Sequence, residues 1–248
     1  MHTRMTAVSG EEHLKVDVVL ENQGQEEAGS LETELEAGRL RLYRRLAGGL
    51  PPGEVLEMEF STRVKNALPG RYPLGLRVLF TDEAGYPLSA VNGSTYSPVK
   101  DLSPNLEAEA GDMDLPGTGT FFLRVKNLED APVQARVWIF LPREITCSRP
   151  EKTVILKPGW KKTIRFPLEN ASAFLGARYP VYAFVEYEKD ESHHTVVARG
   201  TVSIKPRAGW FARTRPVWVM ITLISGLAFL LALYASWKDN HAGDHQRR

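Results

Sequence analysis

The sequence predicts an all-β chain of two tandem antiparallel β-sandwiches, followed by one C-terminal transmembrane α-helix. Three observations carry this prediction. The two halves of the chain match at a nearly constant offset, short alternating apolar segments recur between turn residues, and a long uncharged segment lies near the C-terminus. The composition agrees, because 248 residues suffice for two ordinary domains, and a net charge of +1 lacks the positive field that nucleic-acid binding requires.

The repeat is visible at three pairs of positions. In each half an apolar segment ends at an asparagine, a Pro-Gly turn follows, and a tyrosine then opens a later apolar segment. The matching positions are Asn22 and Asn127, Gly53 and Gly159, and Tyr72 and Tyr179, at offsets of 105 to 107 residues. We therefore expect one domain over residues 1–102 and a copy of it over residues 103–206, each of common domain size.

Each half contains about seven short strand-like segments, which is typical of an immunoglobulin-type sandwich. Residues 16–20 and 181–185, for example, are β-branched, aromatic or alternating. Residues 31–46 have a composition that favours helix, but the equivalent residues 137–141 have the pattern of a strand. We let the repeat decide and predict strands in both halves.

The order of these motifs resembles the CARDB-like and NPCBM-associated immunoglobulin-like domains of prokaryotic membrane-anchored surface proteins. The residues that carry the resemblance are Asn22, Pro52, Gly53, Phe60, Gly70 and Tyr72 in the first half, and Asn127, Pro158, Gly159, Phe166, Gly176 and Tyr179 in the second. The resemblance covers both halves. It implies adhesion, scaffolding or a glycan-associated role outside the cytoplasm, and it carries over no catalytic residue.

Residues 217–237 contain no charged side chain and are predicted to form the transmembrane helix, so the lipid bilayer is the first expected partner. At a rise of 1.5 Å per residue this segment reaches about 31 Å, close to a hydrocarbon core of roughly 30 Å. Residues 207–216 would form a juxtamembrane linker and residues 238–248 a short polar tail.

A stripe of small residues recurs every fourth position within this segment, at Ala228, Ala232 and Ser236. Small residues let two helices approach closely in a membrane. The stripe is therefore a candidate packing surface, and self-association through the transmembrane helix is one expectation.

The orientation in the membrane is not determined by basic residues, since similar numbers flank the segment on both sides. Residues 1–10 lack the apolar core of a signal peptide, so we expect a truncated or mis-started secreted precursor. The resemblance favours β-domains outside the cytoplasm, in the periplasm or at the cell surface. A cytoplasmic tail-anchored protein is the alternative.

The outward faces of equivalent strands differ between the two halves. In the second half they carry Trp138, Phe140, Tyr182 and Phe184, whereas the equivalent positions of the first half are charged residues or glycine. Neighbouring strands of an immunoglobulin-type sheet would gather these aromatic residues into one patch, too large for a soluble domain to leave uncovered. Three occupants are open: another part of the chain such as the first domain, a partner protein, or a sugar ring.

Other motifs give no catalytic or metal function. Residues 115–119 match a sortase signal but lie far from the uncharged segment, Asp112 and Asp114 are too few for a calcium site, and adjacent His193 and His194 on a strand would point to opposite faces. We therefore expect no enzyme, no metal and no cofactor.

The expected function is that of a non-enzymatic, membrane-anchored binding or scaffold protein. It would present two immunoglobulin-like domains to another envelope or membrane protein, with no nucleic acid involved. The first alternative is a carbohydrate-binding or polysaccharide-export accessory protein that uses the same aromatic face. The second is a cytoplasmic tail-anchored adaptor.

Overall fold

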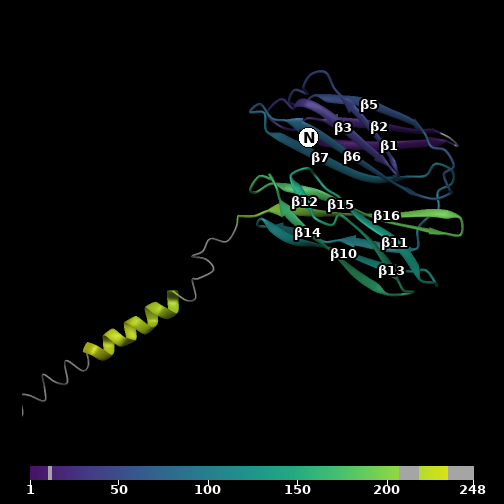
Figure 1. Ribbon diagram of the computed structural model, residues 1–248. Helices are drawn as coiled ribbons and strands as arrows, with labels where there is room; N and C mark the ends of the chain where they lie inside the picture. Colours follow the sequence, from purple (N-terminus) through teal and green to yellow (C-terminus); the bar gives the residue numbers. More distant parts are fainter. Residues whose placement is uncertain (11–12, 207–217, 234–248) are drawn as a thin grey trace, which may run out of the picture. The chain divides into compact units, whose positions relative to one another are not determined.

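The computed structural model describes residues 1–10, 13–206 and 218–233. It divides into two compact units, residues 1–206 and residues 207–248. The described strands lie in the first unit and a helix lies in the second (Figure 1).

The first sandwich is formed by residues 2–96. Its strands are β1 (His2–Gly10), β2 (His13–Glu21), β3 (Gly29–Ala37), β4 (Leu40–Arg45), β5 (Val55–Arg63), β6 (Tyr72–Thr81) and β7 (Pro87–Tyr96). A sheet with the order β1-β2-β5 packs on a sheet with the order β4-β3-β6-β7, and all neighbours are antiparallel. Apolar residues on alternate positions of both sheets fill the core between them.

The second sandwich is formed by residues 106–204. Its strands are β8 (Leu106–Ala110), β9 (Met113–Leu115), β10 (Thr118–Asn127), β11 (Val133–Phe140), β12 (Ile145–Cys147), β13 (Glu151–Leu156), β14 (Lys161–Asn170), β15 (Arg178–Lys189) and β16 (Ser192–Ile204). One sheet has the order β12-β14-β10-β8 and the other the order β13-β11-β15-β16-β9, in which β9 is parallel to β16. A separate core lies between these sheets. The expected domain boundary at residues 102 and 103 falls in the connection between β7 and β8.

The repeat asparagines perform the same structural task in both sandwiches. The side-chain amide of Asn22 donates to the carbonyl oxygens of Glu26 and Leu50, both at 2.8 Å, and its oxygen accepts from the backbone of Gly24 at 3.0 Å. Asn127 donates to two carbonyl oxygens in the same way, at 2.9 and 3.0 Å, and accepts a backbone N–H at 2.8 Å. Both asparagines are buried, so the repeat preserves a residue that satisfies loop backbone groups inside the protein.

The segment 31–46 forms strands, as the repeat predicts and against its helical composition. It contributes most of β3 and all of β4. Leu31, Thr33, Leu35 and Ala37 are buried at alternate positions, which only an extended strand can place on one face. Packing into the sandwich core therefore overrides local propensity here.

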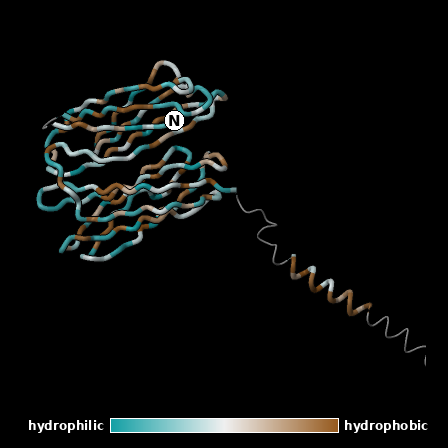
Figure 2. Tube along the Cα trace, turned by 180° about the vertical axis from the view of Figure 1, so that it is seen from behind, coloured by the Kyte–Doolittle hydropathy of each residue, from teal (hydrophilic) through white to brown (hydrophobic). Residues whose placement is uncertain are grey.

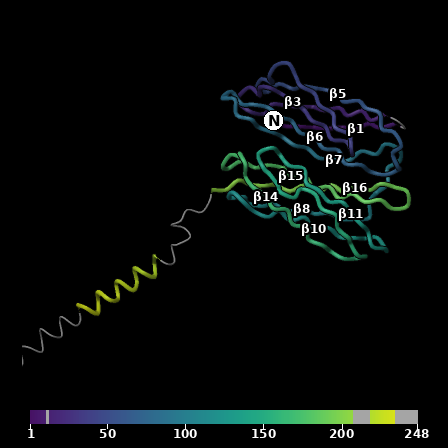
Figure 3. The backbone as a smooth tube through the Cα atoms, in the orientation of Figure 1, coloured from purple at the N-terminus to yellow at the C-terminus, as the bar shows by residue number. Residues whose placement is uncertain are grey.

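The two inner sheets pack on each other, so the four sheets of this unit form a stack. Strands β6 and β7 of the first sandwich contact β15 and β16 of the second (Figure 3). Residues 179 to 187 of β15 are almost all buried, because one face of the strand lies in its own core and the other meets the first sandwich. We call this interface between the inner sheets the seam.

The second unit contains a helix over residues 218–233, whose side chains are exposed and mostly apolar (Figure 2). Among the residues that the structure describes, no helix has the length and apolar character that crossing a membrane requires. The transmembrane helix predicted over 217–237 is therefore unsupported. Residues 217 and 234–237 of that prediction lie outside the described residues.

The predicted small-residue stripe falls partly on this helix. Ala228 and Ala232 lie within it and are exposed. Ser236 lies outside the described residues. The packing role of the stripe therefore stays a prediction.

Candidate functional site

The predicted aromatic residues of the second sandwich lie together at the seam. Strands β11 and β15 are neighbours, and Trp138 is directly opposite Phe184 while Phe140 is directly opposite Tyr182. The Trp138 and Phe184 rings stack at 4.5 Å, and the Trp138 and Phe140 rings meet edge to face at 6.3 Å. Phe140, Tyr182 and Phe184 are buried and Trp138 is half-buried. Their packing partner from the first sandwich is Val91, so the first sandwich occupies this face.

Two glycines of the first sandwich make room for these rings. Gly75 on β6 is directly opposite Gly93 on β7. A Cβ atom at Gly93 would lie 2.6 Å from the Tyr182 ring, and one at Gly75 would lie 3.1 Å from the Phe140 ring. A cross-strand pair of glycines therefore receives a cross-strand pair of aromatic residues, and their lack of side chains allows this close approach.

Polar contacts at one end of the seam bind the two sandwiches to each other. The buried carboxylate of Glu144 accepts hydrogen bonds from the backbone N–H and the hydroxyl of Ser89, both at 2.6 Å. The guanidinium of Arg77 pairs with Glu34 at 2.6 Å, donates to the carbonyl oxygen of Leu141, and lies over the Phe140 ring at 4.6 Å. Hydrogen bonds to a charged group are stronger than neutral ones, so these contacts add to the apolar packing.

Backbone pairing joins the sandwiches at the other end. His193 on β16 donates its N–H to the carbonyl oxygen of Pro69 and accepts from the N–H of Arg71, both at 2.9 Å. Its ring stacks on Tyr72 at 4.2 Å. Gly70, at φ +124°, lies so close that any Cβ there would collide with the carbonyl of His193. This isolated parallel bridge between Gly70 and His193 thus joins the backbones of the two sandwiches.

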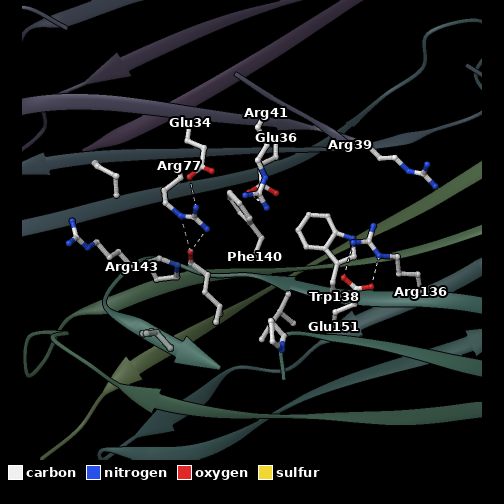
Figure 4. A pocket seen from close by; sticks show the side chains of 17 residues that line it. Glu34, Glu36, Arg39, Arg41, Arg77, Arg136, Trp138, Phe140, Arg143 and Glu151 are labelled. Atoms are coloured by element: carbon white, nitrogen blue, oxygen red, sulfur yellow. Dashed lines mark hydrogen bonds and ion pairs between the residues drawn. The ribbon is translucent and has the colours of Figure 1, made fainter. Parts of the chain in front are cut away.

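A charged groove opens along the seam, and both sandwiches line it. Its volume is about 700 Å³. The charged and aromatic residues that line it are Glu34, Glu36, Arg39, Arg41, Arg77, Arg136, Trp138, Phe140, Arg143 and Glu151 (Figure 4). Figure 4 shows Arg143 and Arg39 toward opposite ends of the view, with the paired guanidinium groups between them.

Most charges in this groove are paired within the described residues. Arg136 pairs with Glu151 at 2.8 Å and with Glu186 at 3.3 Å, and its guanidinium lies 5.8 Å from the centre of the Trp138 ring. The indole N–H of Trp138 donates to the same Glu186 carboxylate. Hydrogen bonding to Glu151 raises the pKa of Arg136 and lowers that of Glu151, so both stay ionised. The groove therefore presents charged groups held in ion pairs beside the rings of Trp138 and Phe140.

A second groove continues from the first, with a volume of about 870 Å³. The two share Gly38, Arg39 and Arg136. We call it the tyrosine groove, because Tyr72, Tyr96 and Tyr187 line it.

Burial raises the pKa of both Tyr96 and Tyr187 to about 12, so these phenols stay protonated. Both side chains form part of the wall of the tyrosine groove. Tyr187 donates to the buried carboxylate of Glu129 at 3.0 Å.

The other residues considered from the sequence lie apart from the grooves or serve the seam. The Asp112 carboxylate accepts from the backbone of Thr201 at 2.7 Å. No group of three or more potential metal-ligating side chains occurs among the described residues. His193 joins the sandwiches, and His194 stacks on Tyr187 at 4.8 Å on the opposite side of the strand.

Sequence reasoning missed the groove, the glycine pair and the charged residues of β3 and β4. One signal was available: the repeat aligns the aromatic residues of the second half with glycine and charged residues of the first. Two faces of one chain that complement each other in volume and polarity can pack together.

Comparisons with known proteins give distant structural similarity. No protein-family model matches the chain, and no curated protein matches its sequence. A Salmonella alpha-2-macroglobulin is 11% identical over 82% of this chain and 16% of its own length, with a TM-score of 0.35. The Escherichia coli alpha-2-macroglobulin in its native conformation is 11% identical over 82% of this chain and 17% of its own length, also at 0.35.

A protein of unknown function from Porphyromonas gingivalis is 15% identical over 80% of this chain and 98% of its own length, with a TM-score of 0.30. The chain thus spans less than a fifth of the length of these two macroglobulins. Similarities this low carry no argument about function, and the finer resemblance to CARDB-like and NPCBM-associated domains stays a prediction. The structural neighbours of this chain are distant all-β folds of immunoglobulin-like or macroglobulin-domain type.

Proposed function

We propose that this chain is a non-enzymatic binding or scaffold protein whose two sandwiches act as one rigid body and present the seam grooves to a partner protein. One observation carries the proposal: both grooves are lined by side chains from both sandwiches, which packing, ion pairs and a backbone bridge hold together. A groove built on a rigid interface is pre-organised, which lowers the entropic cost of binding.

The chemistry of the grooves supports binding rather than catalysis. Most ionisable groups of the charged groove form ion pairs within the protein, and the buried Tyr96 and Tyr187 of the tyrosine groove have a raised pKa. Catalytic groups require a pKa near the working pH and access to a substrate atom. Ion pairs around aromatic side chains such as Trp138 are typical of an interaction surface.

The aromatic residues take different parts in this proposal. Phe140, Tyr182 and Phe184 hold the sandwiches together, since the first sandwich covers them. Trp138 is half-buried and lines the charged groove, so it is the member of the predicted partner-binding set that a partner would contact.

Binding of a carbohydrate is the second candidate, and Trp138 is the observation that favours it. An indole ring beside guanidinium and carboxylate groups is the combination that stacks on a sugar and hydrogen-bonds its hydroxyls. A glycan array separates the two functions. Saturable binding that a Trp138→Ala variant loses would favour the glycan.

The proposal includes attachment to a membrane through residues 217–237, which the sequence predicts. The β-domains would then lie outside the cytoplasm in a cell-envelope assembly, and a cytoplasmic tail-anchored adaptor is the alternative. Fractionation, followed by protease treatment of intact cells and of inverted vesicles, tests both points. Recovery of the chain without membranes would refute the anchor.

Site-specific photo-crosslinking in the native cell tests the proposed function. A photoreactive residue at Leu40, which lines the tyrosine groove, should give one discrete protein adduct. The matched control is Phe122 on β10 of the opposite sheet, which is comparably exposed at 45% against 36% for Leu40. Equal adducts at both positions, or none at Leu40, would overturn the proposal.

A further inference from the structure

Strand β4 is an open edge of the inner sheet of the first sandwich. The sheet order is β4-β3-β6-β7, and β4 pairs with β3 alone among the described strands. The opposite edge is covered, because β1 lies beside β7 and Asn92 donates to the carbonyl oxygen of Thr3 at 2.9 Å. Five of the six residues of β4 are exposed. An exposed edge strand is a template for pairing with another chain.

The direction of the backbone groups on β4 follows from the ladders on both sides of β3. Leu46 donates its N–H to Leu31 at 2.9 Å, and Gly38 donates to Pro73 at 3.0 Å. In an antiparallel ladder, pairs that share backbone hydrogen bonds alternate with pairs that do not. The odd-numbered residues of β3 therefore hydrogen-bond to β4, and the even-numbered residues hydrogen-bond to β6. The N–H and carbonyl groups of Arg41, Tyr43 and Arg45 therefore point outward, away from β3.

The side chains of these three residues are already ordered by their cross-strand neighbours on β3. Arg41 pairs with Glu36 at 3.6 Å, Arg45 pairs with Glu32 at 3.4 Å, and the Tyr43 hydroxyl donates to Glu34 at 3.0 Å. They share the face of the sheet that turns toward the second sandwich, where Arg41 lines the charged groove. The other face of β4 carries Leu40, Leu42 and Arg44. An added strand would therefore meet arginines on one face and leucines on the other.

The charge of this edge selects among partners. Residues 38–45 contain four arginines and no acidic residue. Two copies of β4 paired about a two-fold axis at Tyr43 would place Arg41 opposite Arg45, and like charges directly opposite each other destabilise a sheet. A strand with carboxylates at alternate positions would instead add opposite-charge pairs.

We propose that β4 accepts an extended acidic segment of a partner protein as an additional antiparallel or parallel strand, with carboxylates toward the charged groove and apolar side chains on the other face. Main-chain hydrogen bonds to Arg41, Tyr43 and Arg45 supply affinity, and the alternating side chains supply specificity. This inference rests on the proposed function and names the chemistry of its partner.

Fluorescence anisotropy with the full-length chain tests the inference. The probe is a labelled nine-residue peptide that alternates glutamate and valine, and its control alternates lysine and valine. We expect saturable binding of the acidic peptide alone, weakened by salt because exposed charges are screened. Hydrogen exchange should show new protection within residues 40–45, a signal that charge attraction without strand pairing does not give.

Two variants at one position separate the backbone from the side chain. Tyr43→Pro removes an N–H that points to the open edge, which an edge strand tolerates, whereas Tyr43→Ala keeps that N–H. We expect Tyr43→Pro to bind about tenfold more weakly than Tyr43→Ala, because one main-chain hydrogen bond is lost. Equal thermal stability of the two variants shows that both are folded.

Four results would overturn the inference: no binding of the acidic peptide, equal binding of the lysine peptide, binding without protection of residues 40–45, or equal affinity of the two variants. Polygalacturonate that competes without such protection would assign the groove to an acidic glycan instead. A concentration-dependent dimer that protects the same residues would assign the edge to a second copy. A discrete crosslink at Leu40 together with any of these results would leave the proposed function intact.

Discussion

Replacing Gly93 by alanine should strain the seam and destabilise the two-sandwich unit. The added Cβ atom would lie 2.6 Å from Cγ and Cδ1 of Tyr182 and 2.9 Å from its Cβ. Ordinary contacts of a Cβ atom begin at 3.4 Å, so the ring or a strand must move by roughly 0.8 Å, the difference between these distances. The backbone of Gly93 has no positive φ angle, so the effect reports packing and not glycine conformation.

The protein can accommodate the added methyl group by opening the seam or by displacing one ring, and the response with the lower free-energy cost will occur. Opening the seam would expose Phe140, Tyr182 and Phe184, at about 1.5–3 kcal/mol for each large apolar side chain, or at most on the order of 5–9 kcal/mol together. Local displacement of one ring in a packed site costs typically about 1–3 kcal/mol. Displacing one ring costs less free energy than opening the seam. We therefore expect the seam to stay closed and the unfolding free energy to fall by about 1–3 kcal/mol. In a unit of this size that lowers the melting temperature by roughly 2–12 °C.

Thermal unfolding followed by circular dichroism measures this loss. The control is Gly111→Ala, where the nearest atom to the added Cβ lies at 3.9 Å and φ is not positive. Limited proteolysis of the connection between β7 and β8 reports whether the seam has opened. Equal melting temperatures for the two variants would refute the reasoning, since Tyr182 would then not be packed against β7.

Three further predictions follow from the contacts described. Asn22→Ala and Asn127→Ala should each lower the unfolding free energy by about 2–4 kcal/mol, because three hydrogen bonds are lost at a buried site. Denaturant titration measures this change. Losses below about 1 kcal/mol in both variants would show that the two asparagines do not stabilise the loops in this way. A double-mutant cycle of Ser89→Ala and Glu144→Gln should give a coupling of about 1–3 kcal/mol, whereas additive effects would show that the contact does not join the sandwiches. Burial lowers the pKa of His194 below its ordinary 6.5, so the unfolded chain binds the proton more readily and stability should fall as the pH drops below 6.5. His194→Phe should flatten the melting temperature between about pH 7 and pH 5, and an unchanged slope would assign that dependence to other groups.

Much of the fold could be predicted because its signals are local. Residues 31–37 alternate between buried and outward positions as a strand does. Their composition favours helix, but the repeat aligns them with a clear strand of the second half, so the strand could be predicted. The repeat asparagines mark the loops whose backbone they satisfy. The neighbouring positions of Trp138 and Phe184 follow from strand order within one sandwich.

The candidate site was harder to predict from the sequence, because it forms only where the two folded sandwiches pack together. The aromatic patch was visible as a surface in need of a cover, with the first domain as one of three possible occupants. The complementary surface was not recognised, because it consists of two glycines and of charged residues that pair with each other: Gly75, Gly93, Glu34 and Arg77. A polar face gives no periodic signal that it is an interface.

The sequence by itself determined that this protein contains a duplicated antiparallel β-sandwich and that the second copy carries an aromatic outer face, because both depend on residue spacing of a few positions. It did not determine that the first copy covers this face, that grooves form along the seam, or that β4 is left as a basic open edge. The tertiary structure decided these features. The seam and its grooves arise where residues far apart in the chain come into contact, such as Ser89 with Glu144, 55 residues apart, and Thr195 with the carbonyl of Arg71, 124 residues apart. Such pairs leave no periodic pattern in the sequence.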